Sequence, residues 1–274
     1  MKQLIKADFR RVLRDKLLLV MGILAVVFSL FTSLIYGIFL SDLSVTGVPM
    51  VDGLVSGKGQ FFASFQMGNN LGLIAPVLLA IVLCKDFSYG TVRNKIIAGK
   101  RRSAIFASLF VVCATVFIAV MLLHACLNLG LSLIFFGYQS TPFTWADLGY
   151  FLVSLLFELL VLLFVSALVS YLCATKKNVG LVIVLYVAVA FALVLVGTLM
   201  QMIVSILEVT GGNEQVIDIL RFIDRINVGS AYAYIGTGTA YSLTDVLYLT
   251  VPPIAAIVGL LGLGLWKFKR RDLK

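Results

Sequence analysis

The chain has 274 residues, of which 61% are hydrophobic and only 13% are charged. A soluble domain carries about 25% charged residues, so this composition excludes an ordinary water-soluble globular protein. The net charge of +9 does not indicate nucleic-acid binding, because the basic residues lie at the ends of apolar blocks, an arrangement expected beside anionic lipid.

The first 16 residues form a basic segment with an apolar stripe. At helical spacing, the stripe contains Leu4, Ile5, Asp8, Phe9, Val12 and Leu13. Lysine and arginine occupy most of the remaining surface. The pattern predicts an amphipathic helix, residues 1–16, that lies in the headgroup layer of a membrane.

Six apolar blocks follow, each long enough to cross a bilayer, which requires about 20 residues. They cover residues 17–40, 61–84, 104–136, 150–173, 179–207 and 246–266. We therefore expect an all-α integral membrane protein whose transmembrane domain, residues 17–267, contains six helices.

The orientation follows from the basic residues, of which 19 out of 22 lie before the first block, after the second, after the fourth, or at the C-terminus. Only Lys58, Arg221 and Arg225 lie in the other connections. Because positive charge is retained on the cytoplasmic side, both termini are predicted to be cytoplasmic. The chain is thus expected to be a multi-pass plasma-membrane protein with a basic cytoplasmic tail, residues 268–274.

The connection formed by residues 208–244 is expected on the outer side and has an amphipathic part. Its apolar residues at helical spacing are Val216, Ile217, Leu220, Ile223 and Ile226. This pattern predicts a helix at the outer surface.

The sequence offers little support for catalysis by this chain. It contains no Gly-x-Ser-x-Gly and no His-Glu-x-x-His pattern. The four cysteines, Cys84, Cys113, Cys126 and Cys173, have no paired spacing, so neither a disulfide nor a metal site is predicted. No cofactor is expected in this chain, and any ATP and magnesium would be bound by a partner subunit.

The connection between the second and third blocks, residues 86–99, has a mixed character. Phe87, Val92, Ile96 and Ile97 can gather on one side of a short helix, and Gly99 can end it. Such a segment could lie in the membrane interface or insert into the groove of a partner. Alternatively, it is a basic loop that only fixes the topology.

An acidic–aromatic pair, Asp86 and Phe87, is followed here by Gly-Thr-Val-Arg-Asn from Gly90 and by Gly-Lys-Arg-Arg-Ser from Gly99. This order resembles the permease subunits of ABC-2 type transporters. The basic N-terminal helix, the long connection before the sixth block, and the C-terminal Lys-Phe-Lys-Arg-Arg-Asp-Leu fit the same family.

The resemblance implies a type V exporter-like architecture in which residues 86–99 are the coupling helix that contacts an ATPase. The residues that would take this role are Asp86, Phe87, Gly90, Thr91, Val92, Arg93, Asn94, Ile96 and Gly99. It further implies two cytoplasmic ATPase subunits per complex, a second permease subunit in a homodimer or heterodimer, and a bacterial source. The N-terminal helix would also touch the ATPase. Export is the commoner direction in such families, and an apolar or amphipathic substrate suits a bundle with few polar residues.

Two ionisable residues lie inside predicted spans, Glu158 and His124. Glu158 and Asn128 are both about eight residues from the outer ends of their antiparallel helices, with His124 one turn deeper, so the three side chains could meet. They form either a structural contact or part of a substrate or gating site.

Two rival functions stay open. An ion-gradient-driven transporter would use Glu158 and His124 as ligands, although no inverted repeat supports it. A membrane scaffold without transport activity is the other.

Overall fold

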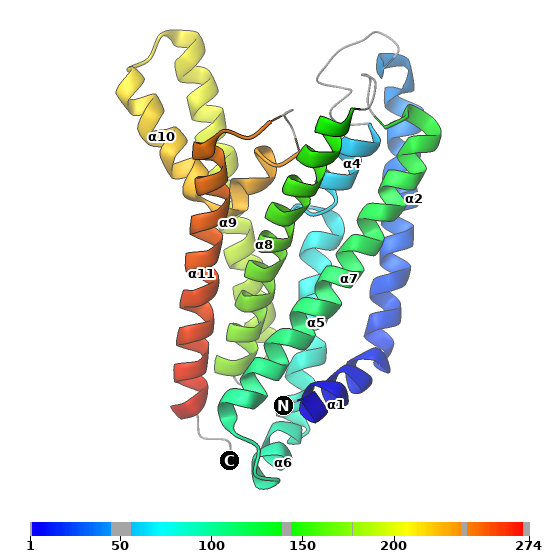
Figure 1. The fold of residues 1–274 in the computed structure, drawn as a ribbon, viewed down its shortest axis with the longest axis vertical. Helices are drawn as coiled ribbons and strands as arrows, with labels where there is room; N and C mark the ends of the chain where they lie inside the picture. The colour runs from blue at the N-terminus through cyan, green and yellow to red at the C-terminus, as the bar shows by residue number, and fades with distance from the viewer. Residues whose placement is uncertain (1, 45–55, 139–143, 177, 237–239, 271–274) are drawn as a thin grey trace.

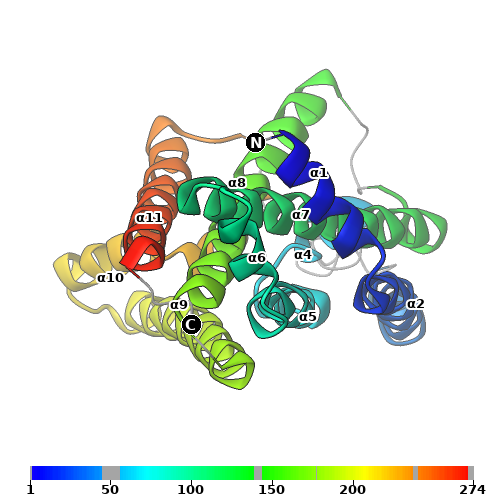
Figure 2. The same ribbon diagram turned by 90° about the horizontal axis from the view of Figure 1, so that it is seen from below.

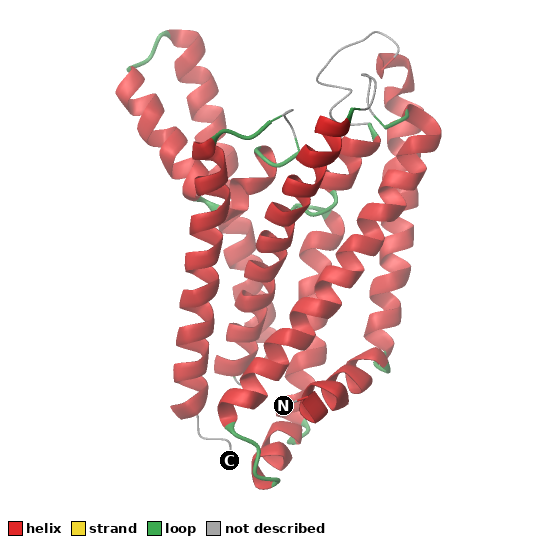
Figure 3. Ribbon diagram, viewed as in Figure 1, coloured by secondary structure: helices red, strands yellow, loops and turns green. Residues whose placement is uncertain are grey.

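The computed structural model describes residues 2–44, 56–138, 144–176, 178–236 and 240–270. Within these ranges every regular element is a helix (Figure 3). Residues 271–274, which are part of the predicted basic tail, lie outside the described residues. So does Lys177, which lies between α8 and α9.

Six helices are long and apolar enough to cross a membrane, which confirms the predicted number of spans and the all-α class. They are α2 (Lys16–Ser44), α5 (Asn70–Ser88), α7 (Arg102–Phe136), α8 (Trp145–Thr175), α9 (Val179–Thr210) and α11 (Leu243–Arg270). They run along the long axis of the molecule (Figure 1). In the six spans, α7 and α8 are the most buried and α9 and α11 the least, so α7 and α8 form the centre of the bundle.

The second span begins later than the sequence predicts. Residues 61–63 belong to a separate short helix, α4 (Gly57–Ala63), and α5 starts at Asn70. The side chain of Asn69 caps α5 by accepting from the backbone N–H of Asn70, and its Nδ2 donates to the carbonyl of Ala63 at 3.0 Å. Polar residues therefore interrupt the apolar block, since they satisfy the backbone groups that a helix end leaves free.

One end of the bundle carries α1 (Lys2–Leu13), α6 (Thr91–Ile97) and the last turn of α11 (Figures 1 and 2). We call it the basic end. The opposite end carries α10 (Glu214–Ile226), in the connection where the sequence predicts an amphipathic helix, followed by a 3-10 helix, η1 (Val228–Ala233). We call it the α10 end.

The last helix continues to Arg270, beyond the predicted boundary. Phe268, expected in a basic tail, is instead buried, with 1% of its surface exposed. It packs with Leu4 of α1, Val92 of α6 and Phe106 of α7, so the end of the last span is part of the fold at the basic end.

Candidate docking site at the basic end

Two glycines define α6. Gly90 separates it from α5 in the left-handed conformation, with φ of 68°, and Gly99 follows it with φ of 76°. Glycine has no Cβ and adopts such angles without strain, so the chain can turn sharply on both sides of a seven-residue helix. As a result, α6 projects from the basic end (Figure 1).

One face of α6 packs against the protein's own helices. Val92 is 2% exposed and lies in an apolar cluster with Leu4, Ile105, Phe106, Ala174 and Phe268. Phe87 and Ile96 pack against this cluster, and the rings of Phe87 and Phe268 meet edge to face with centroids 6.2 Å apart. Phe87, Val92 and Ile96 therefore have an internal partner, which the sequence interpretation did not consider.

The opposite face of α6 is exposed. We call Arg93, Asn94 and Ile97 of α6, together with Tyr89, the C-cap of α5 just before it, the α6 outer face. Tyr89 is 77% exposed and Ile97 is 74% exposed. The expectation that Ile97 shares a side with Val92 is wrong, because the two residues are five positions apart on α6, which places them about 140° apart around the helix.

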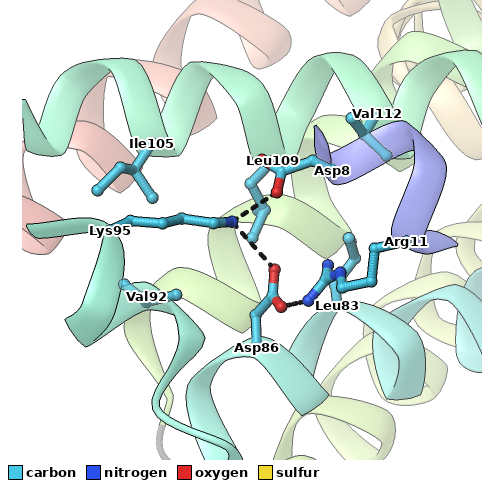
Figure 4. Close-up of a pocket in the computed structure, with 9 residues that line it drawn as sticks. All are labelled: Asp8, Arg11, Leu83, Asp86, Val92, Lys95, Ile105, Leu109 and Val112. Atoms are coloured by element: carbon cyan, nitrogen blue, oxygen red, sulfur yellow. Dashed lines mark hydrogen bonds and ion pairs between the residues drawn. The ribbon is translucent and has the colours of Figure 1, made fainter. Parts of the chain in front are cut away.

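Lys95 joins α6 to two other elements through buried carboxylates (Figure 4). Its Nζ lies 2.6 Å from Oδ1 of Asp8 on α1 and 3.5 Å from Oδ2 of Asp86 on α5. Asp8 and Asp86 are 6% and 2% exposed. The other oxygen of Asp8 accepts a hydrogen bond of 2.6 Å from Ser108 of α7. Lys95 therefore holds α6 against α1 and α5, and Asp8 in turn joins α1 to α7.

Further ion pairs tie α1 to α5. Arg11 pairs with Asp86, and Lys85 pairs with Asp15 at 2.6 Å. Burial lowers the pKa of Arg11, while the carboxylates of Asp8 and Asp15 oppose this shift. Burial alone would raise the pKa of Asp15, but hydrogen bonds from Lys85 and the backbone of Leu17 outweigh it, so this pKa is lowered. We call Asp8, Arg11, Asp86 and Lys95 the charge cluster.

Because the acidic side chains of the basic end are paired inside the protein, its exposed surface, over the residues that the structure describes, carries only positive charge. In α1, α6 and the turns that join them to the neighbouring spans, all within the described ranges, every exposed charged residue is basic. These residues are Lys2, Lys6, Arg10, Arg14, Lys16, Arg93, Lys100 and Arg101. The acidic residues of these segments are paired internally, so the exposed surface is suited to an acidic partner.

The predicted intramembrane group is only partly assembled. Nδ2 of Asn128 lies 2.7 Å from Oγ of Ser64 and 3.3 Å from Nε2 of His124. His124 Nδ1 lies 3.2 Å from the carbonyl of Ala25 and 2.9 Å from Oγ of Ser29. A neutral imidazole protonated at Nδ1 fits these contacts, because it donates to the carbonyl and accepts from Asn128.

Glu158 does not join this group. It is 1% exposed, and in the part of the chain that the structure describes it makes no hydrogen bond to His124 or Asn128. The predicted meeting of the three side chains is therefore not observed. His124 instead connects α2 to α7.

The sequence interpretation missed Asp8, Lys95, Ser108 and Phe268 as parts of the basic-end site. Asp8 carried a signal, because a carboxylate within an apolar helical stripe requires a buried partner. Among the described residues, no group of three or more histidine, cysteine or acidic side chains could hold a metal ion. The arrangement is suited to binding and positioning.

No protein-family model matches this sequence, and no curated protein matches it. The function is therefore argued from the geometry of the basic end and from the motif in residues 86–99.

Proposed function

We propose that this chain is the permease subunit of an ATP-driven ABC transporter of the ABC-2 type. In this proposal α6 is the coupling helix, and its outer face docks on a separate cytoplasmic ATPase. The observation that carries the proposal is that α6 is fixed by the charge cluster, yet Ile97 of α6 and the preceding Tyr89 are largely exposed. Large apolar side chains that project among basic residues are typical of a binding surface.

A coupling element has to transmit movement from its partner to the spans. Here α6 is bonded to α1 through Asp8 and to α5 through Asp86, and α5 and α7 continue directly from its two ends. A displacement of α6 would therefore act on three helices at once. Because breaking a buried ion pair costs about 3–5 kcal/mol, these links resist separation.

The remaining parts of the proposal follow the same family. Two ATPase subunits would bind ATP and magnesium, and a second permease subunit would complete the pathway, as a homodimer or heterodimer. The basic end would face the cytoplasm, because basic residues accumulate there. The substrate would be apolar or amphipathic and would be exported, in keeping with the few polar residues inside the bundle.

Site-specific photocrosslinking tests the docking assignment. A photoreactive amino acid at Ile97 should crosslink, in native membranes, to a protein with Walker A and ABC signature motifs. Val209, which is 88% exposed in the last turn of α9 at the α10 end, is the matched control and should not crosslink to that protein. If Ile97 yields only lipid adducts, the docking assignment is wrong.

Cysteine labelling in intact cells tests the orientation separately. In a variant in which Cys126 is replaced, a cysteine at Thr210 should react with a membrane-impermeant maleimide, and one at Asn94 should react only after permeabilisation. Both positions are exposed, so the difference reports the side of the membrane. Labelling of Asn94 in intact cells would contradict the orientation.

Glu158 favours a second candidate, an ion-gradient-driven transporter. Its Oε1 is buried in α8 without a hydrogen-bond partner among the described residues, and ionisable groups at membrane depth are functional candidates. Glu158→Gln should abolish proton-coupled uptake or release if this candidate is correct. If Glu158→Gln leaves transport and its response to a protonophore unchanged, this candidate is excluded.

A further inference from the structure

Two thiols that are distant in the sequence meet near the basic end. Cys84 of α5 and Cys173 of α8 have their sulfur atoms 3.4 Å apart, and both side chains are buried. Cys173 Sγ also lies 3.8 Å from the carbonyl of Ala80. The sequence analysis found no pairing pattern, since these cysteines are 89 positions apart.

The two sulfur atoms are in van der Waals contact. The sulfur atoms of a disulfide lie about 2.05 Å apart, so they would have to approach each other by roughly 1.4 Å. Rotation about the side-chain bonds of two cysteines on packed helices can supply such a movement. We propose that Cys84 and Cys173 are a site of reversible disulfide formation, which links α5 to α8 when the protein meets a peroxide.

Both cysteines lie close to the ends of their helices at the basic end. Cys173 is two residues before the last residue of α8, Thr175, and Cys84 is four residues before the last residue of α5, Ser88. At 1.5 Å per residue, the thiols lie roughly 3 and 6 Å from these helix ends. Hydrogen peroxide is small and uncharged, so it can enter where larger reagents cannot.

The other two cysteines provide an internal comparison. Cys113 and Cys126 are both on α7, and within the described residues neither contacts another cysteine. Cys113 is buried, whereas Cys126 is exposed. Exposure alone would therefore favour oxidation of Cys126, while proximity favours a bond between Cys84 and Cys173.

The chemistry balances with hydrogen peroxide as the oxidant. One cysteine sulfur, as the thiolate, attacks a peroxide oxygen, the O–O bond breaks, and a sulfenic acid and one water form once the leaving hydroxide is protonated. The second sulfur attacks the sulfenic sulfur, the S–O bond breaks, the S–S bond forms, and a second water leaves. The two thiols lose two electrons and two protons, and the peroxide is reduced to two waters. A thiol reductant reverses the bond by exchange.

The disulfide would restrict the end of α5, from which α6 continues. Cys84 is two residues before Asp86, the carboxylate of the charge cluster that pairs with Arg11 and Lys95. A disulfide at Cys84 would therefore hold the end of α5, and with it α6, against α8. This inference concerns the thiol pair alone and does not depend on the proposed transport function.

The test uses the full chain with Cys113→Ser and Cys126→Ser, purified in detergent and treated with dilute hydrogen peroxide while folded. Free thiols are then blocked with N-ethylmaleimide, and the digest is analysed by mass spectrometry. We expect a peptide pair joined through Cys84 and Cys173 that separates on reduction with a phosphine. The pair should be absent from two further variants, Cys84→Ala and Cys173→Ala.

Unfolded protein is the control for proximity. Since the fold holds the two thiols at a high effective concentration, the crosslink should form at least about tenfold faster in folded protein than after unfolding in dodecyl sulfate. Equal rates would overturn the proposal. It would also be overturned if Cys84 and Cys173 stay reduced under conditions in which Cys126 of the unsubstituted protein is oxidised.

Discussion

At the basic end of the bundle, the carboxylates of the charge cluster pair inside the protein, whereas at the α10 end the ion pairs of Arg221 lie at the surface. Asp86 and Lys95 have only 3% and 14% of their side-chain surface exposed. By contrast, Arg221 of α10 pairs with Glu208 and Asp218, and all three side chains are at least 45% exposed. The two ends thus use the same kinds of residues in different environments.

The environment decides what such pairs do. Exposed ion pairs are screened by water and contribute about 0–1 kcal/mol, so those of Arg221 do little to fix the position of α10. A buried charge that loses its partner is strongly destabilising, so any other position of α6 that separates Lys95 from its carboxylates is unfavourable. The geometry of α6 is therefore set by the protein's own fold before any partner binds.

Asp224 shows that burial alone does not make the ends equivalent. It is a buried carboxylate of α10, but its hydrogen-bond partners are the neutral side chains of Gln201 and Tyr234. Burial, together with the neighbouring carboxylate of Asp224, raises the pKa of Tyr234. Neutral partners therefore accompany the buried carboxylate of the α10 end, whereas ionic partners accompany those of the basic end.

The largest expected effect is that of Lys95→Met. The substitution leaves Asp8 without its cation and removes one of the two cations of Asp86, so the free energy of unfolding should fall by about 3–5 kcal/mol. Denaturation of the purified protein in detergent measures this change. Arg93→Met, on the exposed face of the same helix, is the control and should alter stability by less than about 0.5 kcal/mol. Similar losses in both variants would show that the charge cluster does not hold α6.

A smaller effect is expected for Val92→Ala. The substitution removes the equivalent of two buried methylene groups, so stability should fall by about 1.5 kcal/mol. Ile97→Ala removes an exposed side chain and should leave stability within about 0.5 kcal/mol of the parent. The same denaturation measurement compares the two, and a larger loss for Ile97→Ala would mean that the faces of α6 are assigned in reverse.

At the α10 end, Arg221→Met should have a weaker effect still. Because its ion pairs are exposed, the free energy of unfolding should change by no more than about 1 kcal/mol. The difference between parent and variant should shrink further at high salt, since salt screens exposed charges. A loss as large as that of Lys95→Met would remove the contrast between the two ends.

The smallest effect concerns pH and Asp15. Its pKa is lowered in the folded protein, so the pairing with Lys85 stabilises the fold above the ordinary aspartate pKa of about 4 and is lost as the pH falls through the lowered value. Asp15→Asn should therefore lower the melting temperature slightly at pH 7. It should have no effect at a pH below the lowered pKa of Asp15, where the parent's carboxyl group is protonated. A difference between parent and variant that grows as the pH falls would contradict this sign.

The six spans could be predicted from the sequence, because each apolar block is about as long as a helix must be to cross a membrane. The start of α5 was mispredicted because Phe61 and Phe62 are as apolar as a span, although they belong to α4 and pack beside Phe151. Only the polar residues after Ala63 mark the break.

The contacts of the basic end could not be predicted, because they depend on which helix faces meet. Asp8 and Lys95 are 87 positions apart, and nothing in the spacing of either predicts the other. The left-handed turn at Gly90 places Phe87 and the residues of α6 on different helices, which a single helical period drawn through residues 87–97 ignores. The same limit explains why the contact between Cys84 and Cys173 was missed.

The central claim is that α6 presents a prepositioned docking face, and binding of the proposed partner ATPase tests it most directly. In membranes, the double variant Tyr89→Ala and Ile97→Ala should bind that ATPase at least tenfold more weakly than the parent, since about 1.4 kcal/mol corresponds to a factor of ten and each side chain is worth about that much or more if buried. The variant should keep the parent's stability. Trp145→Ala with Val209→Ala, both exposed at the other end, should bind normally. Unchanged affinity in the α6 variant would contradict the account.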